Sequence, residues 1–180
     1  MTKDDEIRLS LRNSGVPELV FSTTLAKEEA PELRALITGG ALVRPASASG
    51  IYLYPKTRTS TVRARKLFYL VAKELLLSGV TICCLPLSRL MEALNADDFV
   101  GEAARVERVR MVFLLDFYEE GAGFPFSPSD AARLRAWVRH RFEAGNAVSF
   151  LSDSAIDRCI PWWPQSFLGF ISDNVITHSV

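Results

Sequence analysis

The sequence has 180 residues, of which 48% are apolar and 23% are charged, a balance typical of a single globular domain. Lysine and arginine together number 21, as do aspartate and glutamate, so no global field draws the chain to nucleic acid or to a membrane. A chain of this length buries enough apolar surface to fold without a metal or disulfide.

The cysteines and histidines are few and are not spaced as a metal site. Cys83 and Cys84 are adjacent and should point to opposite faces of a strand, Cys159 is distant, and the only histidines are His140 and His178. We therefore expect buried, reduced thiols and no bound metal. The acidic start MTKDDEIRLS lacks the apolar segment of a signal peptide, and no apolar run reaches the roughly 18 residues of a membrane span, so we expect a cytoplasmic protein without a membrane partner.

Residues 1–13 are polar and are expected to be flexible, and residues 14–180 are expected to form one domain. Within that domain the pattern predicts these elements in order: a helix within 28–38, a strand at 51–54, a helix at 65–78, a strand at 80–85, a helix within 88–99, a strand at 110–116, a helix at 129–144, a strand at 147–151 and a last strand at 173–178.

The strands are continuous apolar runs such as VTICCLPL and RMVFLLDF, which is typical of strands buried on both faces. Strands that alternate with helices predict a mostly parallel sheet covered by helices on both sides. The predicted fold class is therefore α/β with three layers.

In this order the segments resemble the ATPase domain of DnaC/IstB-type AAA+ proteins, the bacterial helicase loaders and transposition helper ATPases. The resemblance runs from about Ser14 to the last residue and is carried by SGVPELVFSTTL, KELLLSGVTICCLPLSRLMEAL, VFLLDFYEEG and VSFLSDS. It implies a P-loop-NTPase-like fold in which the loop after residue 54 would hold a nucleotide.

That loop departs from the family pattern. A phosphate loop needs glycines, because backbone amides must curl around the phosphates, and a lysine that meets the terminal phosphates. Here G-x-x-x-x-G-K-[ST] becomes YPKTRTST, in which both glycines are absent and Ser60 stands at the lysine position. Lys56, Arg58 or Lys66 could still contact a phosphate, and Thr61 could ligate magnesium only beside a bound nucleotide.

Three further motifs of the resemblance are altered. Asp116 is retained at the second acidic motif, but Phe117 replaces the acid that would follow it. Asp153 stands where relatives carry asparagine, and its charge would repel a terminal phosphate. Ser166 and Phe170 stand where the family has arginines. Asp116 could hold magnesium or could simply cap a turn at the end of its strand. Together the changes indicate that the chain has no catalytic residues and no nucleotide cofactor.

The segment IPWWPQSFLGF concentrates large aromatic residues, namely Trp162, Trp163, Phe167 and Phe170. They could form a packed cap over the sheet or an exposed patch for a partner. Because the segment lies where relatives present an intersubunit arginine, we predict contact with a second copy or another protein through Trp162 or Trp163.

Basic residues gather in two predicted helices and could contact nucleic-acid phosphates, although zero net charge argues against strong binding. The candidates are Arg63, Arg65, Lys66, Arg135 and Arg139. The alternative interpretation is that these residues lie on solvent-exposed faces of the two helices and bind nothing. On the second helix the apolar stripe should face the core, so its arginines, Arg141 included, are expected to face solvent.

The preferred hypothesis is a non-catalytic AAA+-like protein-interaction module linked to DNA replication, transposition or another mobile-element process. One alternative is a divergent ATP-binding helicase-loader-type ATPase that uses Lys56 or Lys66. A second alternative is a nucleic-acid-binding protein on an inert nucleotide fold.

Overall fold

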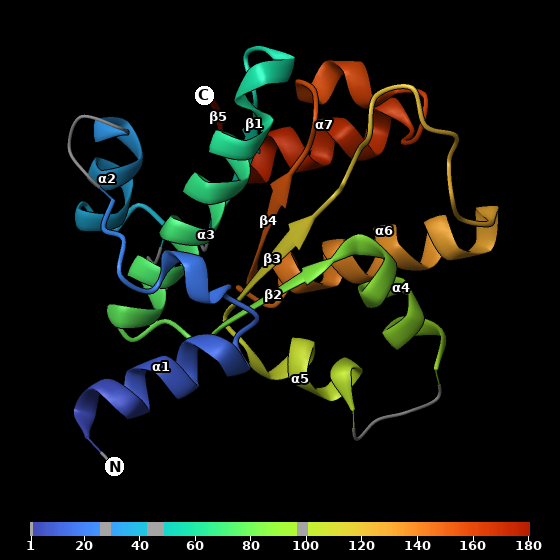
Figure 1. Cartoon of the computed structure of the whole chain (residues 1–180). Coiled ribbons are helices and arrows are strands. Elements are labelled where there is room, and N and C mark those ends of the chain that lie inside the picture. Colours follow the sequence, from blue (N-terminus) through green and yellow to red (C-terminus); the bar gives the residue numbers. More distant parts are fainter. Residues whose placement is uncertain (1, 26–29, 43–48, 97–100) are drawn as a thin grey trace.

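The computed structural model describes residues 2–25, 30–42, 49–96 and 101–180. Five strands, all paired in parallel, form one sheet in the order β2-β3-β4-β1-β5 (Figure 1). The strands are β1 (Gly50–Tyr54), β2 (Ile82–Pro86), β3 (Met111–Leu115), β4 (Ala147–Leu151) and β5 (Val175–Ser179). The predicted strand positions and the parallel sheet are confirmed.

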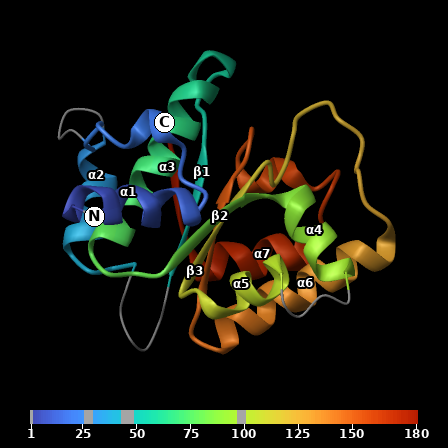
Figure 2. The same cartoon turned by 60° about the horizontal axis from the view of Figure 1, so that its bottom comes forward.

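Helices cover both faces of the sheet and make the expected three layers (Figure 2). One face carries α1 (Lys3–Asn13), α2 (Pro31–Thr38), α3 (Thr61–Leu77) and the 3-10 turn η1 (Glu18–Val20). The other carries α4 (Leu87–Asn95), α5 (Glu102–Arg108), α6 (Pro128–Glu143), α7 (Gln165–Asn174) and the 3-10 turn η3 (Ile156–Cys159). A further turn, η2 (Arg58–Ser60), precedes α3. No helix among the described residues is long and apolar enough to cross a membrane.

Alternation along the strands divides the core into two clusters, one on each face. Cys84 and Phe113 belong to the cluster under α3, whereas Cys83 and Val112 belong to the cluster under α6. The adjacent thiols therefore point to opposite faces, as expected, and both are free and buried.

Two helix starts show how local chemistry sets the boundaries. Helix α6 begins at a capping box between Ser127 and Asp130, which the serine predicted. Helix α3 begins at Thr61, four residues before the predicted start at Arg65. The reason is that Thr57 caps the turn η2, which runs directly into α3.

The polar segment 1–13, expected to be flexible, contains helix α1. A capping box between Thr2 and Asp5 starts this helix, and Leu11 near its end is buried while Ile7 packs against the same core cluster. The hydrophobic pattern did not predict this helix, because so few of its residues face the core.

The chain that follows α1 is held to the body of the protein by a buried lysine. Lys73 of α3 is 5% exposed. Its ammonium group donates hydrogen bonds to the carbonyls of Val20, Phe21 and Thr23, at 3.2, 2.9 and 2.5 Å.

The same N-terminal segment also covers the outer edge of β2. The backbone N–H of Cys84 donates to the carbonyl of Ser14 at 2.7 Å. Gly15 follows with φ +78°, and a Cβ there would lie 2.2 Å from the Cys84 carbonyl oxygen. Only glycine permits this close approach.

Candidate functional site

The parallel sheet brings the predicted nucleotide-site residues to one end of the molecule. The loop after β1, Asp116 after β3 and Asp153 after β4 meet at the carboxyl edge of the sheet, where ligands bind in open α/β folds. A hollow of about 420 Å³ lies there, and its charged lining residues are Lys56, Arg58, Glu120, Asp153, Asp157 and Arg158.

The hydrogen-bonding groups of the loop after β1 are already bonded to other groups of the protein. The N–H of Lys56 donates to the Val180 carbonyl at 2.6 Å, and the N–H of Thr57 donates to Ser60 Oγ at 3.2 Å. The single proton of Ser60 Oγ is shared between the carbonyls of Thr57 and Val180, at 2.8 and 2.9 Å, and Thr61 Oγ1 donates to the Arg58 carbonyl at 3.0 Å. Amides that cradle a phosphate must instead point freely at the ligand.

The retained acid, Asp116, is paired with a guanidinium. Arg65 Nη2 of α3 lies 2.5 Å from Asp116 Oδ1, and both side chains are about half exposed. The space enclosed between Thr61, Arg65, Asp116 and Asp153 is about 10 Å³, at the lower limit for a single water. Asp116 itself adopts φ +58°, a left-handed conformation that turns the chain sharply out of β3. The Arg65 guanidinium thus pairs with an oxygen of the carboxylate that could otherwise ligate a cation.

Phe117, at the position of the second acid, belongs to the core. It is fully buried, and its ring stacks on Trp163 with centroids 5.1 Å apart and planes 8° apart. Its N–H donates to the Leu151 carbonyl at 2.9 Å. A side chain held in this way positions no water.

Carboxylates surround the tip of β4. Burial first, and then the charges of Glu119 and Asp116, raise the pKa of Asp153 above its ordinary value. Ionised carboxylates so placed repel a phosphate group. Among the described residues, no group of His, Cys, Asp and Glu side chains is arranged to hold a metal ion.

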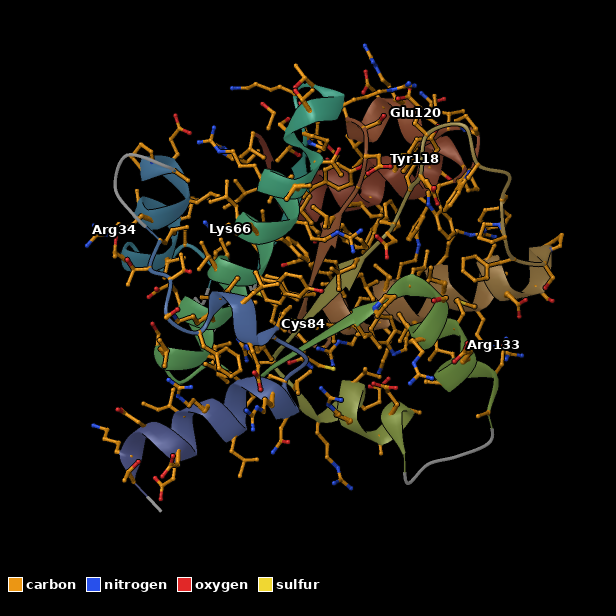
Figure 3. All side chains as sticks on the ribbon, viewed as in Figure 1. Arg34, Lys66, Cys84, Tyr118, Glu120 and Arg133 are labelled. Carbon is orange, nitrogen blue, oxygen red and sulfur yellow. The ribbon has the colours of Figure 1, made fainter. Side chains whose placement is uncertain are left out.

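The two lysines considered as substitutes for the missing one lie in different places. Lys56 is exposed and lines the hollow, next to the exposed ion pair between Arg58 and Glu120 at 3.6 Å. Lys66 projects from the side of α3 that faces α2, whereas Glu120 and Tyr118 lie beyond the opposite side of the helix (Figure 3). Of the two lysines, the geometry therefore retains Lys56 as the one that could reach a ligand in the hollow.

The aromatic segment is packed inside the protein, so the prediction of an exposed patch is wrong for Trp162, Trp163 and Phe167. These side chains are 9%, 1% and 1% exposed. Both indoles find carbonyl acceptors, Trp162 on Ala122 at 3.0 Å and Trp163 on Phe117 at 3.1 Å. Phe170 is half-buried. The alternative interpretation, in which the aromatic segment forms a packed cap over the sheet, is confirmed.

The candidate nucleic-acid contacts do not form one surface. Arg63, Arg65 and Lys66 belong to α3, and Arg135 and Arg139 belong to α6 on the other side of the sheet. Two of the arginines are also engaged, because Arg65 pairs with Asp116 and the Arg139 guanidinium lies 4.6 Å from the centre of the Phe170 ring.

Arg141 corrects the expectation that the arginines of α6 face solvent. It is 1% exposed and donates to the carbonyls of Val106 and Val109, each at 2.8 Å, which ends helix α5. Burial lowers the pKa of its guanidinium. The signal was present in the sequence, because Arg141 follows Trp137 by four residues and Val138 by three, the spacing of the inward face.

No protein-family profile and no curated protein matches the sequence. Among solved structures, that of DnaI aligns with 99% of this chain and 97% of its own, with a TM-score of 0.67 and 13% identity. A putative primosome component from Streptococcus pyogenes serotype M3 aligns with 91% of this chain and 88% of its own, with a TM-score of 0.65 and 15% identity.

AMPPCP-bound DnaA from Aquifex aeolicus aligns with 87% of this chain but 48% of its own, with a TM-score of 0.61 and 10% identity. Identities this low establish the fold alone. The chain therefore shares with DnaI and with AMPPCP-bound DnaA a three-layer α/β fold around a parallel sheet, the fold that the order of its sequence motifs predicted.

Proposed function

We propose that this chain is a non-catalytic protein-interaction module built on the AAA+ fold and linked to DNA replication, transposition or another mobile-element process. The observation that carries the proposal is the ion pair between Arg65 and Asp116, which engages the acid that would otherwise organise a metal ion. The likeness of the fold to DnaI and to a putative primosome component supports the link to replication.

Electrostatics supports the same proposal. A nucleoside triphosphate at the carboxyl edge of the sheet would lie close to the carboxylates of Asp116, Glu119, Glu120 and Asp153. Two nearby guanidinium groups are already paired with acids of this group, Arg65 with Asp116 and Arg58 with Glu120. Binding a triphosphate would require these pairs to open and the carboxylates to tolerate added negative charge.

A divergent ATP-binding protein is the second candidate, and one observation favours it. Lys56 is exposed and lines a hollow of about 420 Å³, which is within the size range of small-molecule sites. An ammonium group in this place could meet a phosphate even though the loop amides are engaged.

Thermal unfolding with and without millimolar MgATP separates the two candidates, because a ligand that binds the native state alone raises its stability. For an interaction module we expect the same melting temperature with MgATP as with magnesium chloride alone. The matched variants are Lys56→Ala and Lys66→Ala, since the first side chain lines the hollow and the second does not. A saturable shift that disappears in Lys56→Ala and persists in Lys66→Ala would refute the non-catalytic proposal.

A further inference from the structure

The two edge strands of the sheet, β2 and β5, differ in how far their outer edges are covered. At β2 the carbonyl of Ser14 accepts the N–H of Cys84, so that edge is partly covered. At the other edge lies β5, beyond β1, and it pairs with β1 along its whole length from Val175 to Ser179 (Figure 1). An edge strand presents a row of unpaired backbone groups to any strand that can reach it.

The backbone of β5 alternates in a way that identifies its outward groups. The N–H and the carbonyl of Val180 bond to Tyr54 and Lys56, so the backbone of this residue faces β1. Because backbone groups alternate in direction along a strand, those of Val175, Thr177 and Ser179 point away from β1. Within the described ranges, these three residues have no hydrogen-bond partner for the outward groups.

The side chains of β5 lack the features that normally prevent strands from pairing at an edge. The sequence VITHS contains no lysine, arginine, acid or proline, and Thr177 at its centre is exposed. His178 is the one titratable residue. Its side chain is 19% exposed, it lies 3.6 Å from Glu32 of α2, and burial lowers its pKa. Apart from this histidine, the strand carries no ionisable side chain.

We propose that β5 pairs antiparallel with β5 of a second copy of this chain, about a twofold axis at Thr177, so that the two sheets become continuous. The proposal names a partner for the interaction module and in that sense rests on the proposed function. In this register Thr177 faces itself and Val175 faces Ser179. All three are positions whose backbone groups point outward, so the outward groups of both strands become paired.

In the same register the side chains of β5 are compatible with a second copy of the strand. A twofold pairing places each side chain of the strand opposite another from the same strand, so any charge at its centre would meet its own image. Here the central pair is threonine with threonine, which is a favourable cross-strand pair, and Ile176 meets His178 on the other face.

Sedimentation velocity measures the association directly. We expect the wild-type chain to shift from monomer to dimer between about 1 and 100 µM, the range of moderate-affinity complexes. Thr177→Lys places two like charges opposite each other and should remain monomeric. Thr177→Pro removes an outward N–H, which a monomer tolerates at a free edge, and should also remain monomeric. Thr177→Val is the matched control, because it keeps the backbone N–H and a β-branched side chain, and it should dimerise like the wild type.

Circular dichroism on the same samples establishes that each variant is folded. A wild type that stays monomeric throughout, or a folded Thr177→Lys variant that still dimerises, overturns the inference. If Thr177→Pro unfolds, Thr177→Lys decides the question. The MgATP experiment is independent of this one. A monomer that ignores ATP refutes only the pairing of β5, whereas a dimer stabilised by MgATP refutes only the non-catalytic function.

Discussion

Replacing Trp163 with alanine tests whether the aromatic segment serves the core or an interface. The indole is 1% exposed and stacks on Phe117 at 5.1 Å, while Phe124 approaches it edge-on at 5.2 Å. Its Nε1–H donates to the Phe117 carbonyl at 3.1 Å. A third ring, that of Phe167, lies 5.7 Å away, so truncation removes a large apolar group, three aromatic pairs and one buried hydrogen bond.

The cost follows from these contacts. Truncating a buried tryptophan to alanine costs about 3–5 kcal/mol of unfolding free energy. That range already contains most of the ring contacts, and the carbonyl left without its donor adds about 1 kcal/mol. We therefore expect a loss of about 4–6 kcal/mol, which is a large part of the roughly 5–15 kcal/mol that stabilises a typical domain.

Urea unfolding followed by far-ultraviolet circular dichroism measures the loss. Phe170→Ala is the matched control, because this ring is only half-buried at the end of the same segment and should cost about 1 kcal/mol. A loss below about 1 kcal/mol in Trp163→Ala, similar to that of the control, would refute the assignment of this side chain to the core.

Three further substitutions probe the site and its support. Phe117→Glu, which restores the second acid, should unfold the protein, because the carboxylate would lie unpaired among aromatic rings; a folded variant on circular dichroism would contradict this. Asp153→Asn should raise the melting temperature at pH 7. The raised pKa of Asp153 means that its ionised form destabilises the native state. This loss of stability is complete above the native pKa and absent below the ordinary pKa of 3.8. The melting temperatures of the wild type and the variant should therefore converge as the pH falls towards 3.8. Equal melting temperatures at pH 7 would contradict this. Lys73→Met leaves three carbonyls without their donor and should cost about 1–3 kcal/mol. It should also speed hydrogen exchange in residues 14–25, and unchanged exchange there would refute the role of Lys73.

The sequence by itself determined the strands, their parallel arrangement and the layers of helices. Runs such as VTICCLPL and RMVFLLDF can be buried on both faces in only a few ways, and the alternation with helices restricts the connections further. The departures from the phosphate-loop pattern were also readable, because the requirement for glycine is a local property of the backbone.

The tertiary structure alone decided how individual side chains are used. Composition could not distinguish a packed aromatic cap from an exposed patch at Trp162 and Trp163, because the outcome depends on whether α7 folds back over the sheet. Nor could spacing reveal that Arg65 meets Asp116, since the two residues are 51 positions apart in the sequence. They come together only because α3 packs on the sheet beside the end of β3. Charge and hydrophobicity are properties of single residues, whereas an ion pair and a buried ring depend on where distant residues meet.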